Sequence, residues 1–413
     1  MSKMQPRRHE GTKLGFFFVF SCLRGQRPLH KAARRATGGP WLATRGSCAF
    51  LVLVFTSGLA APTKPVAVPR FEIDPYWPKP LPNSWEMGEL GAVFVDAKDH
   101  VWVISRPRTL TADQIGLSLA PPTAECCIPA PPVIEFDQEG RVVQSWGGPG
   151  RGYEWPANEH GLFVDHQGNV WLGGNTTNED SQILKFAHDG KFLMQIGRAK
   201  TSKGSLDTDN LNRPAQIWVW EKTNEVFVAD GYQNRRVIVF DANTGAFKRM
   251  WGAYGNKPDD VYSRARVSDG PRGSEQFNIV HGLAIANDGL VYVSDRVNNR
   301  IQVFTLDGTF IKEGFIARGT LDARGTAFAV AFSPDKEQKF LIVPDGANDK
   351  VRILDRQAQQ VLDSWGRPGP YAGQWHWLHS LAIDSKGNLY TAESRGNRLQ
   401  KFVNKGTKMV TTH

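Results

Sequence analysis

The chain has 413 residues, of which 50 are Lys or Arg and 41 are Asp or Glu, giving a formal net charge of +9. This excess is confined to residues 1–61, where ten basic residues stand against one acidic residue, so the rest of the chain is neutral. A nucleic-acid or membrane-surface function resting on overall basic charge is therefore excluded. The 41 glycines and 25 prolines favour short strands joined by turns.

Residues 1–61 are expected to be a leader that is removed. A basic region precedes the apolar run Cys48–Thr56, and the small residues Ser57–Ala61 follow it, an order that resembles a secretory signal. The run is short for a transmembrane helix. A membrane anchor and an over-long N-terminus are the alternatives. We expect a secreted or periplasmic protein without stable membrane insertion after leader removal.

The sequence contains four cysteines, two of which, Cys22 and Cys48, lie in the leader. The other two, Cys126 and Cys127, are adjacent in a proline-rich stretch and have no further cysteine to pair with. Either a vicinal disulfide or two free thiols fits this arrangement.

Residues 62–85 form a proline-rich segment in which Arg70–Ile73 can make one short strand. We expect this segment to close a ring against the last repeat. Residues 86–405 contain six repeats of about 40 residues, each with four short strands. The clearest repeat is Asn278–Phe304, in which Val, Ile, Tyr and Phe fill the strands and Asn, Asp and Gly fill the turns.

The six first strands are expected at Ala92–Asp96, Gly161–Asp165 and Gln216–Trp220, after His281, at Phe328–Phe332 and after His379. Four strands at this spacing are typical of a propeller blade, so the sequence predicts an all-β, six-bladed β-propeller. The sixth repeat reaches Phe402 without a clear fourth strand, which the N-terminal segment can supply.

Tryptophan followed by glycine recurs at blade ends, and packing between neighbouring blades is the simplest interpretation of Trp146, Trp251 and Trp365. Three connections are too long for simple turns, namely Arg106–Pro132, Arg198–Pro214 and Ala253–Asn278. Long loops in a compact domain often carry function.

Histidine alternates around the ring. The position before the first strand is, in blade order, Gly91, His160, Ala215, His281, Phe328 and His379. Since first strands line the channel of a propeller, His160, His281 and His379 are expected to converge on the axis. Three imidazoles with an open fourth position suit a catalytic zinc, and imidazole also suits iron, copper or nickel.

The alternative is that these histidines are repeat residues that cap the strand with a hydrogen bond. His100, His166 and His188 occur in turns or at strand starts, and a solvated surface is expected for them. His376 lies three residues before His379 and either supports the site or packs among aromatic residues.

These motifs resemble the catalytic core of peptidyl-α-hydroxyglycine α-amidating lyase, a six-bladed propeller of NHL-like repeats. The resemblance covers roughly Gly88 to Phe402 and is most specific over Phe227–Gly252. It implies that His160, His281 and His379 bind a catalytic zinc. It also implies carbon–nitrogen lyase activity that cleaves a carbinolamide to an amide and glyoxylate.

The resemblance further implies two catalytic residues. Tyr232, in an Asp-Gly-Tyr turn, would take a proton from the substrate hydroxyl, and Arg106 would hold a carboxylate. The alternatives are that Tyr232 packs in its turn, that Arg106 pairs with Asp96, and that Arg108 takes the place of Arg106.

The chain departs from that family at two positions. Ser380 stands where the family has an aspartate that helps to hold an axial calcium, so calcium would have to bind through carbonyls such as those of Ala92 and Leu162. Gln233 replaces a cysteine that follows the site tyrosine.

Three functions remain to be weighed. A metal-dependent lyase acting on a small-molecule or peptide substrate fits the alternating histidines, and a hydrolase on the same site is a variant of it. A scaffold that binds protein or glycan fits the repeats, but it gives no reason to focus three imidazoles on the channel. A calcium-dependent lactonase-like site would require axial Glu, Asn and Asp. We expect a monomer.

Overall fold

The structure is a computed structural model that describes residues 65–262 and 270–411. The predicted leader, with Cys22 and Cys48, lies outside the described residues. The described part consists of strands and loops with three short 3₁₀-helices and no α-helix. It contains no helix with the length and apolar character needed to cross a membrane.

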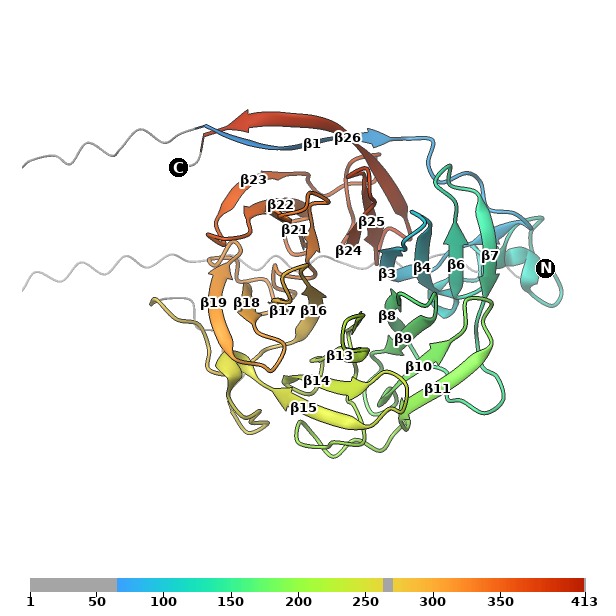
Figure 1. Ribbon diagram of the computed structural model, residues 1–413. Helices are drawn as coiled ribbons and strands as arrows, with labels where there is room; N and C mark the ends of the chain where they lie inside the picture. The colour runs from blue at the N-terminus through green and yellow to red at the C-terminus, as the bar shows by residue number, and fades with distance from the viewer. Residues whose placement is uncertain (1–64, 263–269, 412–413) are drawn as a thin grey trace, which may run out of the picture. The chain divides into compact units, whose positions relative to one another are not determined.

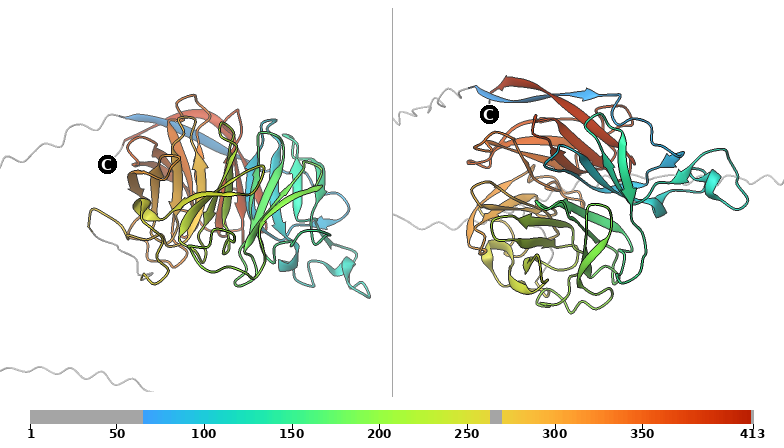
Figure 2. Two further views of the ribbon diagram at one scale, coloured as in Figure 1. Left: turned by 60° about the horizontal axis from the view of Figure 1, so that its bottom comes forward. Right: turned by 45° about the vertical axis from the view of Figure 1, so that its right-hand side comes forward.

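Six antiparallel sheets of four strands surround a central axis (Figure 1). The turned view on the left of Figure 2 shows the strands running between two faces of the ring, where the connecting loops gather. The predicted six-bladed β-propeller is confirmed.

The strands of the first three blades are as follows, from the axis outward. Blade 1 has β3 (Glu89–Val95), β4 (Val101–Arg106), β6 (Val133–Phe136) and β7 (Val142–Trp146). Blade 2 has β8 (Glu159–Val164), β9 (Val170–Gly174), β10 (Gln182–Phe186) and β11 (Phe192–Gly197). Blade 3 has β12 (Gln216–Trp220), β13 (Glu225–Asp230), β14 (Arg236–Asp241) and β15 (Phe247–Trp251).

The other three blades follow the same order. Blade 4 has β16 (Val280–Ile285), β17 (Val291–Asp295), β18 (Arg300–Phe304) and β19 (Phe310–Phe315). Blade 5 has β20 (Ala331–Phe332), β21 (Phe340–Asp345), β22 (Lys350–Asp355) and β23 (Val361–Trp365). Blade 6 has β24 (Leu378–Ile383), β25 (Leu389–Glu393), β26 (Leu399–Val410) and β1 (Val66–Asp74).

The first strand of blade 5 is shorter than the predicted strand Phe328–Phe332. The carbonyl of Pro344 in β21 accepts a hydrogen bond from the N–H of Phe328. The nitrogen of Pro344 therefore faces the side of β21 on which β20 lies. Because proline has no N–H to donate, the ladder with β20 is interrupted there. Only Ala331 and Phe332 remain paired with β21.

Blade 6 is completed by the N-terminal strand. β1 pairs antiparallel with β26 from Val66 opposite Val410 to Asp74 opposite Lys401, with a bulge at Pro69. Both strands are longer than the sequence predicted. Pro69 is tolerated because the register shifts directly after it, on an outer strand where its missing N–H breaks no regular ladder.

A buried carboxylate at the end of the second strand pairs with an arginine in, or directly before, the third strand in four blades. The pairs are Asp230–Arg236 (2.9 Å), Asp295–Arg300 (2.8 Å), Asp345–Arg352 (2.7 Å) and Glu393–Arg398 (2.9 Å). In the first three an asparagine of the turn donates to the same carboxylate. These charge-assisted bonds fix the turn on the face of the ring where the second strands end.

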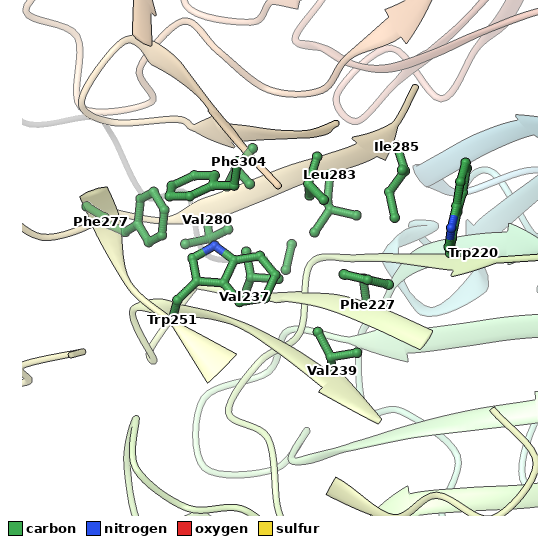
Figure 3. Packing of buried hydrophobic residues seen from close by; sticks show 14 residues of the cluster. Trp220, Phe227, Val237, Val239, Trp251, Phe277, Val280, Leu283, Ile285 and Phe304 are labelled. Atoms are coloured by element: carbon green, nitrogen blue, oxygen red, sulfur yellow. The ribbon is translucent and has the colours of Figure 1, made fainter. Parts of the chain in front are cut away.

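Tryptophan at the end of the fourth strand packs on the next blade, as predicted. Trp251 of blade 3 is 3% exposed, and its ring lies 5.9 Å from that of Phe304 in blade 4. Figure 3 shows Trp251 between Phe277, Val280 and Phe304. Trp146 packs in the same way on Phe186, at 5.2 Å. Burial of such rings joins the blades into one continuous core.

The insertion in blade 1 has short elements of its own, η1 (Pro107–Thr109), η2 (Gly116–Ser118) and β5 (Ile128–Pro129), and β5 pairs in parallel with β2 (Trp85–Glu86). Cys126 and Cys127 form a disulfide in this insertion, so the first of the two alternatives holds. The remaining 3₁₀-helix, η3 (Ala253–Gly255), begins the connection between blades 3 and 4.

We predict that Asp345→Ala lowers the free energy of unfolding by about 3 kcal/mol, because the fully buried carboxylate is lost and the guanidinium of Arg352, 16% exposed, is left without its partner. Glu72→Ala is the control, since the pair Arg70–Glu72 is about half exposed and its loss should cost less than about 1 kcal/mol. Urea unfolding measures both values. Equal losses of unfolding free energy in the two variants would show that the Asp345–Arg352 pair stabilises the blade no more than an exposed ion pair does.

Candidate metal centre

The three alternating histidines meet on the axis. Each is the second residue of a first strand, in β8, β16 and β24. Their ring centroids are 4.8 to 4.9 Å apart, and none of the side chains is more than 4% exposed. One ring nitrogen from each of His160, His281 and His379 lies within 4.8 Å of the other two.

A β-bulge aims each histidine at the axis. The pairing of the first with the second strand shifts register between Glu159 and Leu162, between Val280 and Gly282, and between Leu378 and Ser380. The histidine is an extra residue in each bulge, which turns its side chain out of the sheet alternation. A strand that kept strict alternation would leave these rings packed between blades.

Each histidine is held through Nδ1 by a main-chain carbonyl of the following blade. The acceptors are Ala215 for His160 (2.8 Å), Phe328 for His281 (2.7 Å) and Gly91 for His379 (2.8 Å). A carbonyl oxygen can only accept, so Nδ1 carries the proton in all three rings. The lone pair of a neutral imidazole is then on Nε2, the atom that a metal would bind.

Glycine after the histidine lets these carbonyls come close. A Cβ at Gly161 would lie 2.7 Å from the Ala215 oxygen, and a Cβ at Gly282 would lie 2.8 Å from the Phe328 oxygen. Both oxygens are the acceptors of the preceding histidine. The glycine in blades 2 and 4 thus leaves room for the acceptor carbonyl, whereas blade 6 makes the same bond with Ser380 after His379 and Gly91 as the acceptor.

The surroundings keep the imidazoles neutral. Burial lowers the pKa of all three rings well below the usual value, and neighbouring positive charge lowers it further. The nearest guanidinium groups with this effect are those of Arg106 and Arg296. Three neutral rings with their lone pairs directed inward form a donor set suited to zinc or another divalent transition metal.

Tyr232 is in direct contact with two of the histidines. Its hydroxyl lies 2.9 Å from Nε2 of His160 and 3.0 Å from Nε2 of His281, and it accepts a hydrogen bond of 3.1 Å from Arg296. Because a hydroxyl has one proton, it can donate to only one imidazole at a time. The prediction that placed Tyr232 near the histidines therefore agrees with the geometry, and simple turn packing does not describe this residue.

Arg106 lies at the same end of the ring with a free donor. Its Nε donates to the carbonyl of Glu159 (2.6 Å) and its Nη1 to Glu89 (3.2 Å), while the buried Nη2 has no hydrogen-bond partner. The alternative pairing with Asp96 does not occur. Arg108 donates instead to Glu159 (2.5 Å), which removes it as a substitute for Arg106.

A cavity of about 210 Å³ lies beside the histidines. The residues that line it include Glu89, Arg106, Tyr232, Arg296, His379 and Arg395. Three arginines against one glutamate make the cavity positive, so it suits an anionic ligand. His376 is exposed and takes no part in it.

Two arginines of this region were missed from the sequence. Arg296 contacts the Tyr232 hydroxyl, and the guanidinium groups of Arg213 and Arg296 lie 5.0 and 5.1 Å from the Tyr232 ring centroid. Arg106, Tyr232 and Arg296 all lie at or just beyond the end of a second strand. Aligning those strand ends, as was done for the position before the first strand, would have found Arg296.

The calcium prediction remains a prediction. Ser380 lies beneath His379, and its hydroxyl accepts a hydrogen bond of 3.4 Å from the main chain of Val93. Within the described residues, the groups of His, Cys, Asp and Glu that could share an ion are the three histidines and a second cluster, Asp96, Glu135 and His188.

The chain is similar to several known proteins. The NHL repeat family matches residues 277–304, which contain His281 and Arg296. Peptidyl-glycine alpha-amidating monooxygenase A of Xenopus laevis is 35% identical over 81% of this chain and 33% of its own length. Peptidyl-alpha-hydroxyglycine alpha-amidating lyase 1 of Drosophila melanogaster is 28% identical over 61% of this chain and 46% of its own length.

The chain is an NHL-repeat propeller that resembles the peptidyl-α-hydroxyglycine α-amidating lyases. It spans less than half the length of the two relatives just described. NHL repeat-containing protein 3 of Mus musculus is 25% identical over 81% of this chain and 84% of its own length. Because this relative is named for its repeats and not for an enzyme activity, a binding scaffold stays an alternative to an enzyme for this chain.

We predict that, in the presence of chelator, the free energy of unfolding of this protein decreases as the pH is lowered from about 7.5 to about 5.5. The lowered pKa of the buried histidines means that the unfolded chain takes up protons first as the pH falls below about 6.5, which favours unfolding. In His281→Gln the loss should be smaller by about 1 kcal/mol or more. Urea unfolding in chelator at both pH values measures it. His166→Gln, at an exposed turn, is the control, and equal losses in all three proteins would contradict the prediction.

Proposed function

We propose that this protein is a secreted or periplasmic metal-dependent lyase that cleaves the carbon–nitrogen bond of a carbinolamide ending in α-hydroxyglycine, giving an amide and glyoxylate. The observation that carries the proposal is the convergence of three neutral imidazoles beside Tyr232 and the unpartnered Nη2 of Arg106. The amidating relatives support the same class of reaction.

His160, His281 and His379 would hold the metal, which is zinc or another divalent transition metal. The fit rests on the three Nδ1 hydrogen bonds, which leave each Nε2 as an acceptor with no proton of its own. When bound, such an ion acidifies a hydroxyl group and polarises a carbonyl oxygen.

Arg106 would bind the substrate carboxylate. Its Nη2 is buried and without a partner, and burial of an unpaired donor is costly unless a ligand satisfies it. A guanidinium matches a carboxylate in a two-pronged contact, which also fixes the orientation of the glycine carbon. Arg395, 60% exposed and 3.5 Å from Glu89, adds positive charge at the same cavity.

Tyr232 would carry the proton. Its oxygen takes the proton of the substrate hydroxyl as the carbon–oxygen double bond forms, and the electron pair of the breaking carbon–nitrogen bond goes to nitrogen. The same proton then passes from Tyr232 to that nitrogen, which completes the amide. Tyr232 must therefore start as the tyrosinate and return to it, and Arg296, which donates to the Tyr232 oxygen, would stabilise that negative charge before the first transfer and after the second.

A scaffold that binds protein or glycan is the second candidate, and the likeness to NHL repeat-containing protein 3 favours it. A metal-dependent hydrolase on the same residues is a third. A scaffold has no use for a buried unpartnered guanidinium next to three imidazoles, whereas either enzyme does. The two experiments below separate these possibilities.

We predict that the purified chain carries about one zinc or other transition-metal ion at the histidines, and that His281→Ala loses it. Elemental analysis after purification without chelators measures the content, with His166→Ala as the control. A wild-type protein without transition metal would remove the basis for both enzyme hypotheses.

We predict that Tyr232→Phe lowers kcat on an α-hydroxyglycine peptide by about 10²-fold to 10⁴-fold, because the proton carrier is lost. Arg106→Lys should raise KM more than it lowers kcat, since a lysine cannot make the two-pronged contact. Glyoxylate release is the assay, and Tyr76→Phe, 79% exposed, is the control. If wild-type protein with bound metal releases no glyoxylate, the hydrolase becomes the better hypothesis.

A further inference from the structure

A second cluster of possible metal ligands lies at the opposite ends of the strands from the three histidines. Asp96 follows β3, His100 precedes β4, Glu135 belongs to β6, and His188 belongs to the turn between β10 and β11 of the next blade. One atom each from Asp96, Glu135 and His188 lies within 4.8 Å of the other two. The cluster therefore joins blade 1 to blade 2.

Glu135 is the unusual member. It is 1% exposed, and the matching third-strand position in the other blades is Lys185, Val239, Val303, Ile353 or Lys401. Its carboxylate contacts Nδ1 of His100 (2.7 Å), Nε2 of His188 (3.4 Å) and the side-chain amide of Gln144 (2.5 Å). Among the described residues no lysine or arginine forms an ion pair with Glu135 or Asp96.

The charge that remains to be balanced in this cluster is that of Glu135. A buried carboxylate is costly unless a cation or several strong donors balance it. Asp96 accepts from the indole of Trp102 and from two main-chain N–H groups, whereas Glu135 has one amide and two imidazoles around it. The buried Nε2 of His188 lies 3.4 Å from Glu135 without forming a hydrogen bond. The sequence led us to expect His100 and His188 on a solvated surface. In the structure both rings contact the buried carboxylate of Glu135.

We propose that Asp96, Glu135 and His188 form a second binding site for a divalent transition metal such as zinc. Imidazole and carboxylate together are ligands that zinc uses in proteins. His100 donates to Glu135 and would orient it as a supporting residue, in the way that metal-bound carboxylates are held. The side chains of His100 and His188 are 26% and 42% exposed, so an ion can reach the site from solvent.

Binding requires one local change. The amide nitrogen of Gln144 lies 2.8 Å from Nδ1 of His188, so without metal the ring proton sits on Nε2. For Nε2 to bind an ion, the proton must move to Nδ1, and Gln144 must turn its oxygen toward Nδ1. This turn gives up the hydrogen bonds that the Gln144 amide makes to Glu135 and to the His188 carbonyl, and the ion would replace the first of them at the Glu135 carboxylate. With the ion in place, a turn of blade 2 would be tied to Asp96 and Glu135 of blade 1, which would stabilise the ring at this junction.

The test counts zinc ions on the full chain after chelation and reloading, using Glu135→Gln, His188→Ala and His281→Ala. We expect about two ions on wild-type protein and about one on each variant. Zinc should raise the melting temperature of His281→Ala but not of the double variant His281→Ala with Glu135→Gln. His166→Ala, an exposed histidine of blade 2, is the matched control and should keep both ions.

The outcomes separate this inference from the proposed function. One ion on wild-type protein that is lost in Glu135→Gln but kept in His281→Ala supports the second site and removes the first. One ion that is lost only in His281→Ala overturns the second site, and the cluster is then a hydrogen-bonded junction between blades. If Glu135→Gln does not fold, His188→Ala decides, because its side chain lies at the surface.

Discussion

The centre of this ring depends on hydrogen bonds from the histidines of the even blades to main-chain carbonyls of the odd blades. Blades 2, 4 and 6 each supply an imidazole, and blades 3, 5 and 1 supply the carbonyl that holds its Nδ1. These acceptors are main-chain atoms, so the backbone of the odd blades fixes the tautomer of each ring. The side chains of the even blades supply the imidazoles, and their spacing around the ring is threefold.

The same end of the ring combines features that would be unfavourable separately. Buried imidazoles avoid protonation, and the guanidinium groups of Arg106 and Arg296 discourage it further. Those arginines are in turn costly to bury, and Arg106 keeps one donor unsatisfied. The two arginines would repel a bound metal cation, whereas an anionic ligand would be attracted by the cation and by the arginines. The charges of the site would therefore suit a metal and an anion together better than either alone.

Repetition made much of this molecule predictable from its sequence. Strand patterns fixed the number of blades, and alignment of the repeats brought out His160, His281 and His379. What could not be read were features set by pairing between distant segments. The lengths of β1 and β26 are set by their pairing with each other. The short β20 reflects Pro344 in the neighbouring strand. Glu135 contacts His188 only because blades 1 and 2 are adjacent. Arg296 was missed because its role appears only when the ends of second strands are compared.

The pairing of β1 with β26 has a consequence for biosynthesis. Blade 6 takes its outer strand from the start of the described chain and its third strand from the end, so it can be completed only after β26 has been made. His379 belongs to that blade, and its acceptor carbonyl at Gly91 lies in the first. The three imidazoles therefore come together only when the ring closes. A metal held by all three would have to be loaded after that step.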